Sequence, residues 1–465
     1  MSKALPKRKM YRYCLADIAK GLFNGMIGNY LLYFFQPTVK SGLPVLLPEN
    51  KILGYITIMA LITGLGKIVD AVTDPLVATL SDKCTHKAGR RMPFLRYAAI
   101  PYALSVLMIF YAPFRAGSLA NALWVGFFLI SYYTAYTFFF IPRNALVPEI
   151  IPDAKVRVGY YGISTAFFMG SSSFMYAATL FVNLLKNAGL SPLWAWRAVF
   201  TLFATIGITC LLLSAYAFDE KEYVTKNVRP TESLLRSCGQ VFRNKNFLCF
   251  AAGDLFSGVS MAFFQTAMLY YITMLLNVPE SQSFLVMLSA IGVALCLFPL
   301  IIRISRKYNK KAPLIAASVV FTVVFAFIFF ADKIAALAPG YELLVGLGLG
   351  IVVSFPFAAI NILPQSIISD IIQQDSLQSG VNREGIFSAT KTFIEKCASA
   401  MAMVVVSSVL AIGAGPGESV GLMGVKLTGV FAGGFSLLSL VFFLLYNDKK
   451  VTSYIEAHAG KEAAK

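Results

Sequence analysis

The sequence predicts an all-α membrane protein of twelve transmembrane helices, arranged as two pseudo-symmetric six-helix bundles. Of its 465 residues, 57% are hydrophobic and only 14% are charged, with a mean hydropathy of +0.70, whereas soluble domains are about half apolar and about a quarter charged. Twelve apolar runs are each long enough to cross a hydrocarbon core of roughly 30 Å. The predicted spans lie near residues 14–38, 52–80, 94–113, 119–142, 159–185, 195–217, 246–276, 281–303, 312–331, 341–371, 386–413 and 424–446.

A polar segment between the sixth and seventh spans divides the chain into two halves. We expect an N-terminal bundle at 1–217, a middle loop at 218–245, a C-terminal bundle at 246–446 and a tail at 447–465. With both termini in the cytoplasm, about 28 of the 40 basic residues fall on the cytoplasmic side, as the positive-inside rule requires. The prediction is therefore a multi-pass protein of the cell (plasma or inner) membrane with both ends inside.

Several classes of function are disfavoured by the sequence. The net charge of +17 lies in alternate loops, so it indicates membrane topology rather than nucleic-acid binding. Neither motif nor spacing indicates a catalytic triad, a phosphate loop or a zinc site, so we expect no enzyme activity and no cofactor. The seven cysteines show no pairing or metal spacing. A monomer in the lipid bilayer is expected.

The second predicted span carries three charges on one face. Lys67, Asp70 and Asp74 are spaced by three and four residues, so their side chains stack along a helix. One isolated charge at a helix centre costs about 2.5 to 3.5 kcal/mol on insertion scales, so these groups must compensate one another. Their sum is one negative charge, which one monovalent cation or one proton would balance. In the competing interpretation, Lys67 only neutralises one aspartate while the other lies near the interface.

Neighbouring residues extend this candidate cation site. Carboxylate oxygens suit Na⁺ or Li⁺, and the Thr73 hydroxyl supplies a further oxygen ligand. Pro75 cannot donate a backbone hydrogen bond, which leaves the carbonyl of Ala71 available for coordination. A proton relay without a metal ion remains an alternative.

Two basic loops recur at the same place in each half, at 81–94 and 303–314. Any cytoplasmic loop is expected to be basic, but the first has the sequence SDKCTHKAGRRMPF and resembles the loop signature of the major facilitator superfamily. That resemblance implies a conformational latch in which a helix-end carboxylate pairs with arginine across helices. The residues that match the latch are Asp82, Lys83, Arg90 and Arg91.

The stretch KIVDAVTDPLVATLSDKCTHKAGRRMPF is similar to the signature of the glycoside-pentoside-hexuronide:cation symporters, the family of the melibiose carrier. The resemblance also covers LADIAKGLFNGMIGNYLLYFF, AYTFFFIPRNALVPEI and NREGIFSATKTFIEKCASA. It implies the major facilitator fold and alternating access. It assigns cation binding to Asp70, Asp74 and Thr137, places Lys20 on the first span, and gives Lys396 a bridging role between cation and solute. Lys67 stands where the family usually has Arg.

The family's sugar-binding residues are largely replaced in this chain. The resemblance puts Gly21 and Phe140 where two carboxylates grip sugar hydroxyls, Ile163 in place of an arginine, and Asn144 and Asn361 in place of aromatic residues. A melibiose-like galactoside bound in the same way is therefore not expected, because a pocket that selects hydroxyls needs buried polar partners. The candidate cavity residues are Lys20, Tyr30, Tyr136, Phe140, Arg143, Asn144, Asn361 and Lys396.

Four further ionic contacts are expected. Arg143 meets either an anionic group of the solute or, as a residue at the end of a span, lipid headgroups. Lys391 and Glu395 are four residues apart and pair, so Lys396 needs another partner, for which we expect Asp70 or Asp74. Asp370 pairs with a basic loop residue or with Arg383.

These observations predict a symporter that imports a small organic solute, a glycoside or other sugar derivative, with Na⁺, H⁺ or Li⁺ as coupling ion. One alternative is a carrier of an amphipathic solute such as a lysolipid, which the aromatic run from Tyr132 to Phe140 would suit. DAVTDPLV also resembles the corresponding element of sodium-coupled lysophosphatidylcholine carriers. Another alternative is a membrane sensor that does not transport.

Overall fold

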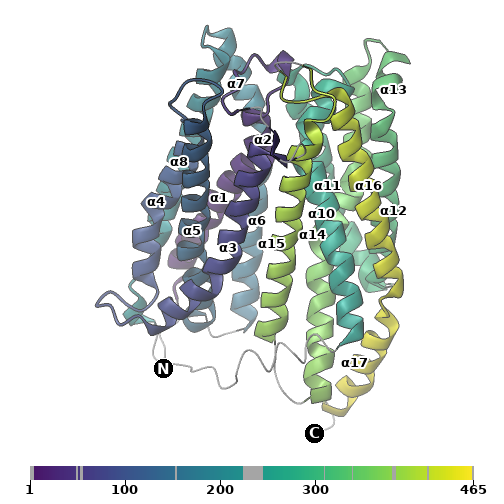
Figure 1. Ribbon diagram of the computed structural model, residues 1–465. Coiled ribbons are helices and arrows are strands. Elements are labelled where there is room, and N and C mark those ends of the chain that lie inside the picture. The colour runs from purple at the N-terminus through teal and green to yellow at the C-terminus, as the bar shows by residue number, and fades with distance from the viewer. Residues whose placement is uncertain are drawn as a thin grey trace. The chain divides into compact units, whose positions relative to one another are not determined.

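The computed structural model is almost wholly helical (Figure 1). It describes residues 5–48, 51–52, 56–151, 154–223, 244–307, 309–337, 339–379, 384–415 and 418–462. Within these residues twelve long helical segments coincide with the twelve predicted spans, so the all-α prediction is confirmed. Ten are long and apolar enough to cross a membrane. The two remaining segments, which contain α1 and α3, are not in that set; both carry charged residues.

Contacts between residues divide the chain into two units. The first unit comprises Met1–Val228 together with Leu410–Gly421, and the second comprises Arg229–Val409 and Leu422–Lys465. The short segment Leu410–Gly421 therefore groups with the N-terminal helices, whereas the sequence placed it in the C-terminal bundle.

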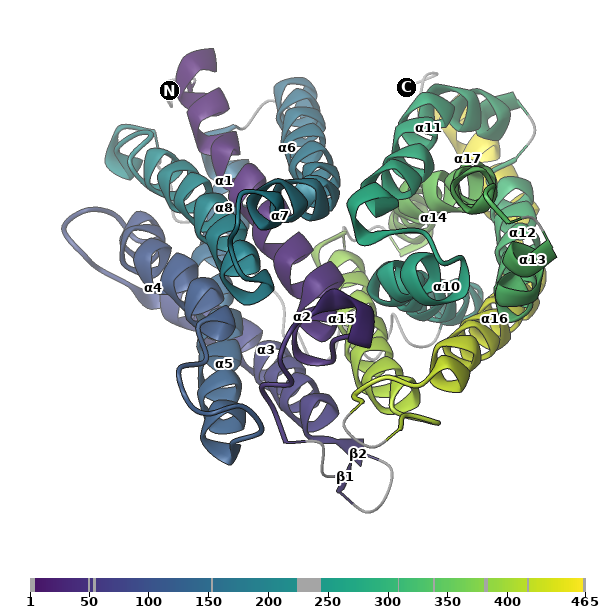
Figure 2. The ribbon, with the colours of Figure 1, turned by 90° about the horizontal axis from the view of Figure 1, so that it is seen from above.

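The first unit holds six long helical segments (Figure 2). Helix α1 packs against α6 and α8, α3 packs against α5, and α4 packs against both α5 and α8. The elements of this unit are α1 (Lys7–Gly25), the π segment η1 (Met26–Tyr30), α2 (Leu31–Phe35), η2 (Val39–Ser41), β1 (Lys51–Ile52), β2 (Ile56–Thr57), α3 (Ile58–Lys83), α4 (Met92–Phe110), α5 (Leu119–Ile150), α6 (Ala154–Phe174), η3 (Met175–Ala177), α7 (Ala178–Asn187), α8 (Pro192–Ala215) and η4 (Glu220–Glu222).

The second unit repeats most of these helix contacts. Helix α11 packs along α14, and α16 packs on α10 and α12. Its elements are α10 (Lys245–Tyr270), the π segment η5 (Tyr271–Leu275), α11 (Glu280–Lys307), α12 (Lys311–Phe329), α13 (Ala331–Leu337), α14 (Glu342–Ser379), α15 (Glu384–Leu410), α16 (Leu422–Leu445) and α17 (Asp448–Glu462). The first span of each unit thus contains a π segment, a feature that is frequent at functional sites.

Local sequence explains where the helices of the cation-site pair begin. The Thr57 side chain accepts a hydrogen bond from the amide of Ala60 and caps α3, and Ser118 caps α5 in the same way. Helix α3 runs through Pro75 without interruption. Because α3 and α5 pack along one another, residues 67 to 74 of α3 lie beside the middle of α5.

Close approach of α1 to α6 fixes the identity of residue 21. A Cβ atom built on Gly21 would lie 2.0 Å from Ser171 Oγ and 2.5 Å from the carbonyl oxygen of Phe168. No residue with a side chain fits there without separating the two helices. Packing of α1 against α6 therefore excludes a carboxylate at this position.

Candidate functional site

The predicted cation-binding side chains converge between α3 and α5. The Thr137 hydroxyl on α5 lies 3.0 Å from Asp74 Oδ1 and 3.4 Å from Asp70 Oδ1. The Thr73 hydroxyl lies 3.4 Å from that of Thr137 and donates to the backbone carbonyl of Asp70 at 3.2 Å. Asp70 is buried, with 2% of its surface exposed. The two carboxylates thus meet at the Thr137 hydroxyl, with the Thr73 hydroxyl beside it. Carboxylate and hydroxyl oxygens are hard donors, and such a set fits Na⁺ or Li⁺.

Lys67 lies about one turn from Asp70 and about two turns from Asp74 on the same helix. Its Nζ is 4.6 Å from the centroid of the Tyr133 ring, which belongs to α5. The ring is held close to α3 because residue 66 is glycine, where a Cβ would already stand 3.0 Å from the ring. A cation over an aromatic face is stabilised by the ring, and the expected balance of one positive and two negative groups at this site stays a prediction.

Lys20 is surrounded by aromatic rings. Its Nζ lies 5.2 Å from the ring centroid of Phe168, 5.5 Å from that of Phe140 and 5.9 Å from that of Tyr136. These rings come from α5 and α6, and the lysine is half-buried on α1. Lys20, Tyr136 and Phe140 therefore lie together, as expected for residues of one cavity, and Phe168 is an addition that the sequence did not indicate.

Arg143 is not at a lipid interface. Its side chain is 2% exposed and forms a bidentate ion pair with Asp17 of α1, with Nη2–Oδ2 at 2.7 Å and Nη1–Oδ1 at 3.0 Å. Ser164 of α6 also donates to Asp17, and Arg143 donates to the carbonyl of Tyr13 at 3.0 Å. Both expected partners, headgroups and solute, are therefore wrong for this conformation. Sequence reasoning overlooked Asp17 altogether.

The other cavity candidates are distributed over both units. Tyr30 is fully buried: its hydroxyl donates to the carbonyl of Met175, and its ring packs on Trp196, so it belongs to the core and not to a cavity wall. Asn144 is exposed on α5. In the second unit Asn361 is exposed and donates to the carbonyl of Phe357 at 2.7 Å, and Lys396 is half-buried on α15.

One expected ion pair on α15 is present and another remains a prediction. Lys391 and Glu395 form an ion pair within the helix, as expected from their spacing. The proposed contact of Lys396 with Asp70 or Asp74 would join the two units, and it stays a prediction. Arg383, the alternative partner for Asp370, lies outside the described residues.

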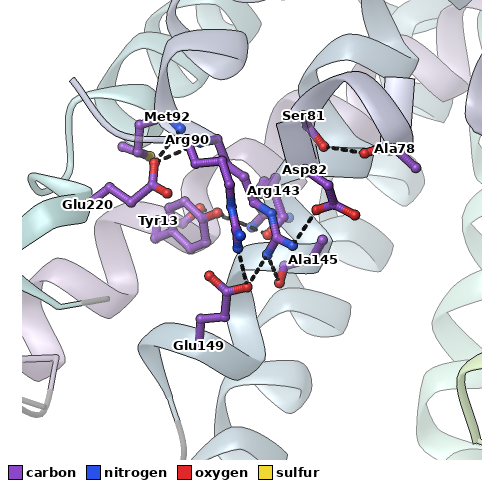
Figure 3. A network of polar contacts seen from close by, with 11 residues as sticks. Tyr13, Ala78, Ser81, Asp82, Arg90, Met92, Arg143, Ala145, Glu149 and Glu220 are labelled. Carbon is purple, nitrogen blue, oxygen red and sulfur yellow. Dashed lines mark hydrogen bonds and ion pairs between the residues drawn. The ribbon is translucent and has the colours of Figure 1, made fainter. Parts of the chain in front are cut away.

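The predicted latch forms a network at one end of the first unit (Figure 3). Arg91 binds Asp82 at the end of α3 at 2.9 Å and Glu149 of α5 at 2.8 Å, and Arg90 binds Glu149 at 2.7 Å. The pairing of a helix-end carboxylate with arginine is therefore present. Lys83 is exposed and takes part in none of the ion pairs between described residues.

Two carboxylates missed from the sequence complete this network. Glu149 forms ion pairs with both Arg90 and Arg91 (Figure 3). Glu220 of η4 accepts hydrogen bonds from the backbone amides of Arg91 and Met92, which have no partner within the helix because they lie at the start of α4. The acid thus ties the beginning of the third span to the segment that follows the sixth. Helix-end acids have no distinguishing spacing in sequence, so only the fold reveals their partners.

The second unit contains a corresponding network. Lys310, which directly precedes α12, binds Asp370 of α14 at 2.5 Å, so the predicted pairing of Asp370 with a basic loop residue is confirmed. The backbone amide of Lys310 donates to Asp448, at the start of α17. Burial, followed by the charge of Asp370, raises the pKa of Asp448 above its ordinary value. Lys310, Asp370 and Asp448 occupy the places that Arg90, Glu149 and Glu220 hold in the first unit.

The fold and these sites define a multi-pass membrane transporter, and comparisons with known proteins agree. A family model described as MFS/sugar transport protein matches residues 12–448. The chain belongs to this family, within the major facilitator superfamily.

Several relatives are named as symporters or permeases. The chain is 24% identical to the "Putative glycoside/cation symporter YagG" of Escherichia coli (strain K12), over 76% of this chain and 74% of that protein. It is 22% identical to the "Uncharacterized symporter sll1374" of Synechocystis sp., over 88% and 87%, and to the "Lactose permease" of Lactobacillus helveticus, over 87% and 62%. The family and its named members are transporters and not enzymes.

Solved structures support the fold alone. The nucleoside transporter NupG superimposes with a TM-score of 0.65 at 13% identity, over 95% of this chain and 100% of that one. A D-xylose-proton symporter superimposes with a TM-score of 0.63 at 13% identity, over 96% and 98%. Both are transporters, which places the twelve helices in the major facilitator fold.

Proposed function

We propose that the protein is a cation-coupled symporter that imports a sugar-type solute by alternating access, with its coupling ion bound at Asp70 and Asp74. The observation that carries the proposal is the convergence of both carboxylates on the Thr137 hydroxyl between α3 and α5. The names of the relatives, a glycoside/cation symporter and a lactose permease among them, support the solute class.

The charge of the site gives the reason for coupling. Two carboxylates and one lysine leave one negative charge among packed helices, which is costly without a counter-ion. A bound Na⁺, Li⁺ or proton removes that cost and holds α3 against α5 through shared ligands. If the same conformation also binds the solute, cation and solute raise each other's affinity by the same factor.

The cation site can be tested without knowing the solute. We expect Na⁺ or Li⁺, at constant ionic strength maintained with choline chloride, to raise the thermal unfolding temperature of the purified protein. Asp70→Asn and Asp74→Asn should each abolish that response. Asp219→Asn, which alters an exposed carboxylate after α8, should retain it. A cation response that persists in both site variants would disprove the assignment.

Transport is tested in proteoliposomes. Glycosides that stabilise the protein in a thermal screen, performed with and without Na⁺, would be assayed for uptake driven by a Na⁺ or pH gradient. A proton-coupled carrier would respond to the pH gradient alone, and Asp74→Asn would again remove the response. Binding without flux under either gradient would contradict a symporter.

A further inference from the structure

The carboxylate nearest to Lys20 in sequence, Asp17, pairs with another residue. Asp17 and Lys20 are three residues apart on α1, a spacing at which opposite charges on a helix normally pair. No ion pair joins them in the described structure, because both oxygens of Asp17 bind Arg143. Ser164 donates a further hydrogen bond to the same carboxylate. Arg143 therefore pairs with the Asp17 carboxylate, the group that would otherwise neutralise Lys20.

Arg143 has further contacts beside its ion pair with Asp17. Its guanidinium lies over the Tyr13 ring at 4.9 Å and donates to the Tyr13 carbonyl at 3.0 Å. With 2% of its surface exposed, it is inaccessible to a solute. A buried guanidinium with a bidentate carboxylate partner is a strong interaction, and Asp17 is also only 4% exposed. The pair is neutral as a whole and adds no net charge to its surroundings.

Lys20 is left as a cation without a carboxylate. The described residues form no salt bridge with it, and its partners are the rings of Phe168, Phe140 and Tyr136. It is half-buried midway along the span that runs from Lys7 to Phe35, the depth at which transporters bind their solutes. Gly21 and Phe140 supply no charge beside it. A cation at this depth requires an anion, water or a bound ligand to offset its desolvation.

We propose that Arg143 is a specificity-determining residue that sequesters Asp17 from Lys20, so that Lys20 selects solutes that carry a carboxylate, sulfonate or phosphate group. The proposal rests on the proposed function, since it assigns Lys20 to the solute site. Phe140 connects the two cations physically, because its ring faces Lys20 at 5.5 Å and Arg143 at 5.7 Å. Loss of Arg143 would release Asp17 toward Lys20 and cancel the charge that attracts the solute.

The proposed pairing of Asp17 with Arg143 in place of Lys20 is tested by the reactivity of the Lys20 amine in the purified protein. A lysine paired with a carboxylate holds its proton more tightly and is acylated more slowly, by roughly tenfold or more for a close pair. Acetylation by an uncharged N-hydroxysuccinimide ester, measured at Lys20 by mass spectrometry, should slow by that factor in Arg143→Gln. The double variant Asp17→Asn/Arg143→Gln should react at the wild-type rate, and Arg143→Lys should do the same.

The double variant separates this role from simple destabilisation. If Arg143 only stabilises the fold, removing both partners will not restore the original rate. Arg143→Met fills the same space and replaces R143Q where that variant folds poorly, as judged by thermal unfolding. Wild-type reactivity in both R143Q and R143M would overturn the proposal.

The solute class is tested by protection of Lys20 from acetylation. The probes are methyl β-D-glucuronide, glucose 6-phosphate and a 6-sulfonated glucoside, with methyl β-D-glucoside as the uncharged match. At least one anionic probe should slow acetylation at least fivefold in the wild type and the double variant, but not in R143Q. Equal protection by the uncharged glucoside, or protection by no anionic probe, would refute the anionic class. If Na⁺ and Li⁺ do not raise the unfolding temperature of the wild type, the coupling site is refuted. Protection of Lys20 by an anionic probe would still support the anionic solute class.

Discussion

Replacement of Thr137 by valine is the sharpest test of the cation site. Valine has the same shape as threonine but no hydroxyl, so the packing of α5 against α3 is retained while one oxygen is removed. That oxygen lies 3.0 Å from Asp74 and 3.4 Å from Asp70, and it carries only one proton. It therefore donates to one carboxylate at a time and presents its lone pairs to a cation.

The structure gives a magnitude for this change. A hydrogen bond to a charged group contributes about 1.5 to 3 kcal/mol, and about 1.4 kcal/mol corresponds to a factor of ten in a binding constant. Thr137→Val should therefore raise the Na⁺ dissociation constant by roughly 10- to 150-fold. Thr137→Ser, which keeps the hydroxyl, should remain within about fivefold of the wild type, a difference of about 1 kcal/mol.

Thr73→Val is the matched control. Its hydroxyl donates to the backbone carbonyl of Asp70 at 3.2 Å and reaches Thr137 only at 3.4 Å, and it contacts no carboxylate oxygen directly. Its loss should weaken Na⁺ binding by less than about fivefold, since a neutral hydrogen bond contributes about 1 kcal/mol. Binding would be measured by titration of the unfolding temperature with Na⁺. An unchanged constant in Thr137→Val, or an equal loss in Thr73→Val, would contradict the proposed geometry.

Three further predictions concern the scaffold and are measured by thermal unfolding in detergent. Gly21→Ala should destabilise the protein by about 1 to 3 kcal/mol or more through overpacking, while Gly170→Ala on α6, where a Cβ meets nothing within 4 Å, should be neutral; equal effects would contradict the close helix contact. Glu149→Gln should cost about 1 to 3 kcal/mol because it leaves two arginines without their shared partner, whereas Asp82→Asn, whose side chain is 52% exposed, should cost less than about 1 kcal/mol. Although burial opposes it, the ion pair with a lysine on α16 lowers the pKa of Asp332, so this carboxylate stabilises the fold above its ordinary pKa and the benefit disappears as pH falls through the lowered value. Asp332→Asn should therefore lower the unfolding temperature at neutral pH and have no effect in strong acid, and a deficit that persists in acid would contradict the ion pair.

The sequence predicted most of the fold because hydropathy and helical spacing are local signals. Asp70 and Asp74 could be assigned to one face from their spacing alone, and Thr137 followed from the family resemblance. The structure adds that these side chains meet through a hydroxyl on a neighbouring helix. No single-sequence pattern contains that distance.

Arg143 shows where sequence reasoning failed. The predicted fourth span ended at residue 142, which placed Arg143 among headgroups, but α5 continues to Ile150 and carries the arginine into the protein. Its partner Asp17 is 126 residues away in sequence. The prediction that Tyr30 lines a cavity was wrong for a related reason. In the sequence, an aromatic residue on a span gives the same pattern whether it faces a cavity or packs in the core, as Tyr30 packs on Trp196.

The contact between α1 and α6 at Gly21 also limits how this transporter can change its solute during evolution. A carboxylate side chain at position 21 would clash with α6 unless Ser171 and the neighbouring turn of α6 had already moved. Substitutions at the two helices are therefore epistatic, and their order matters.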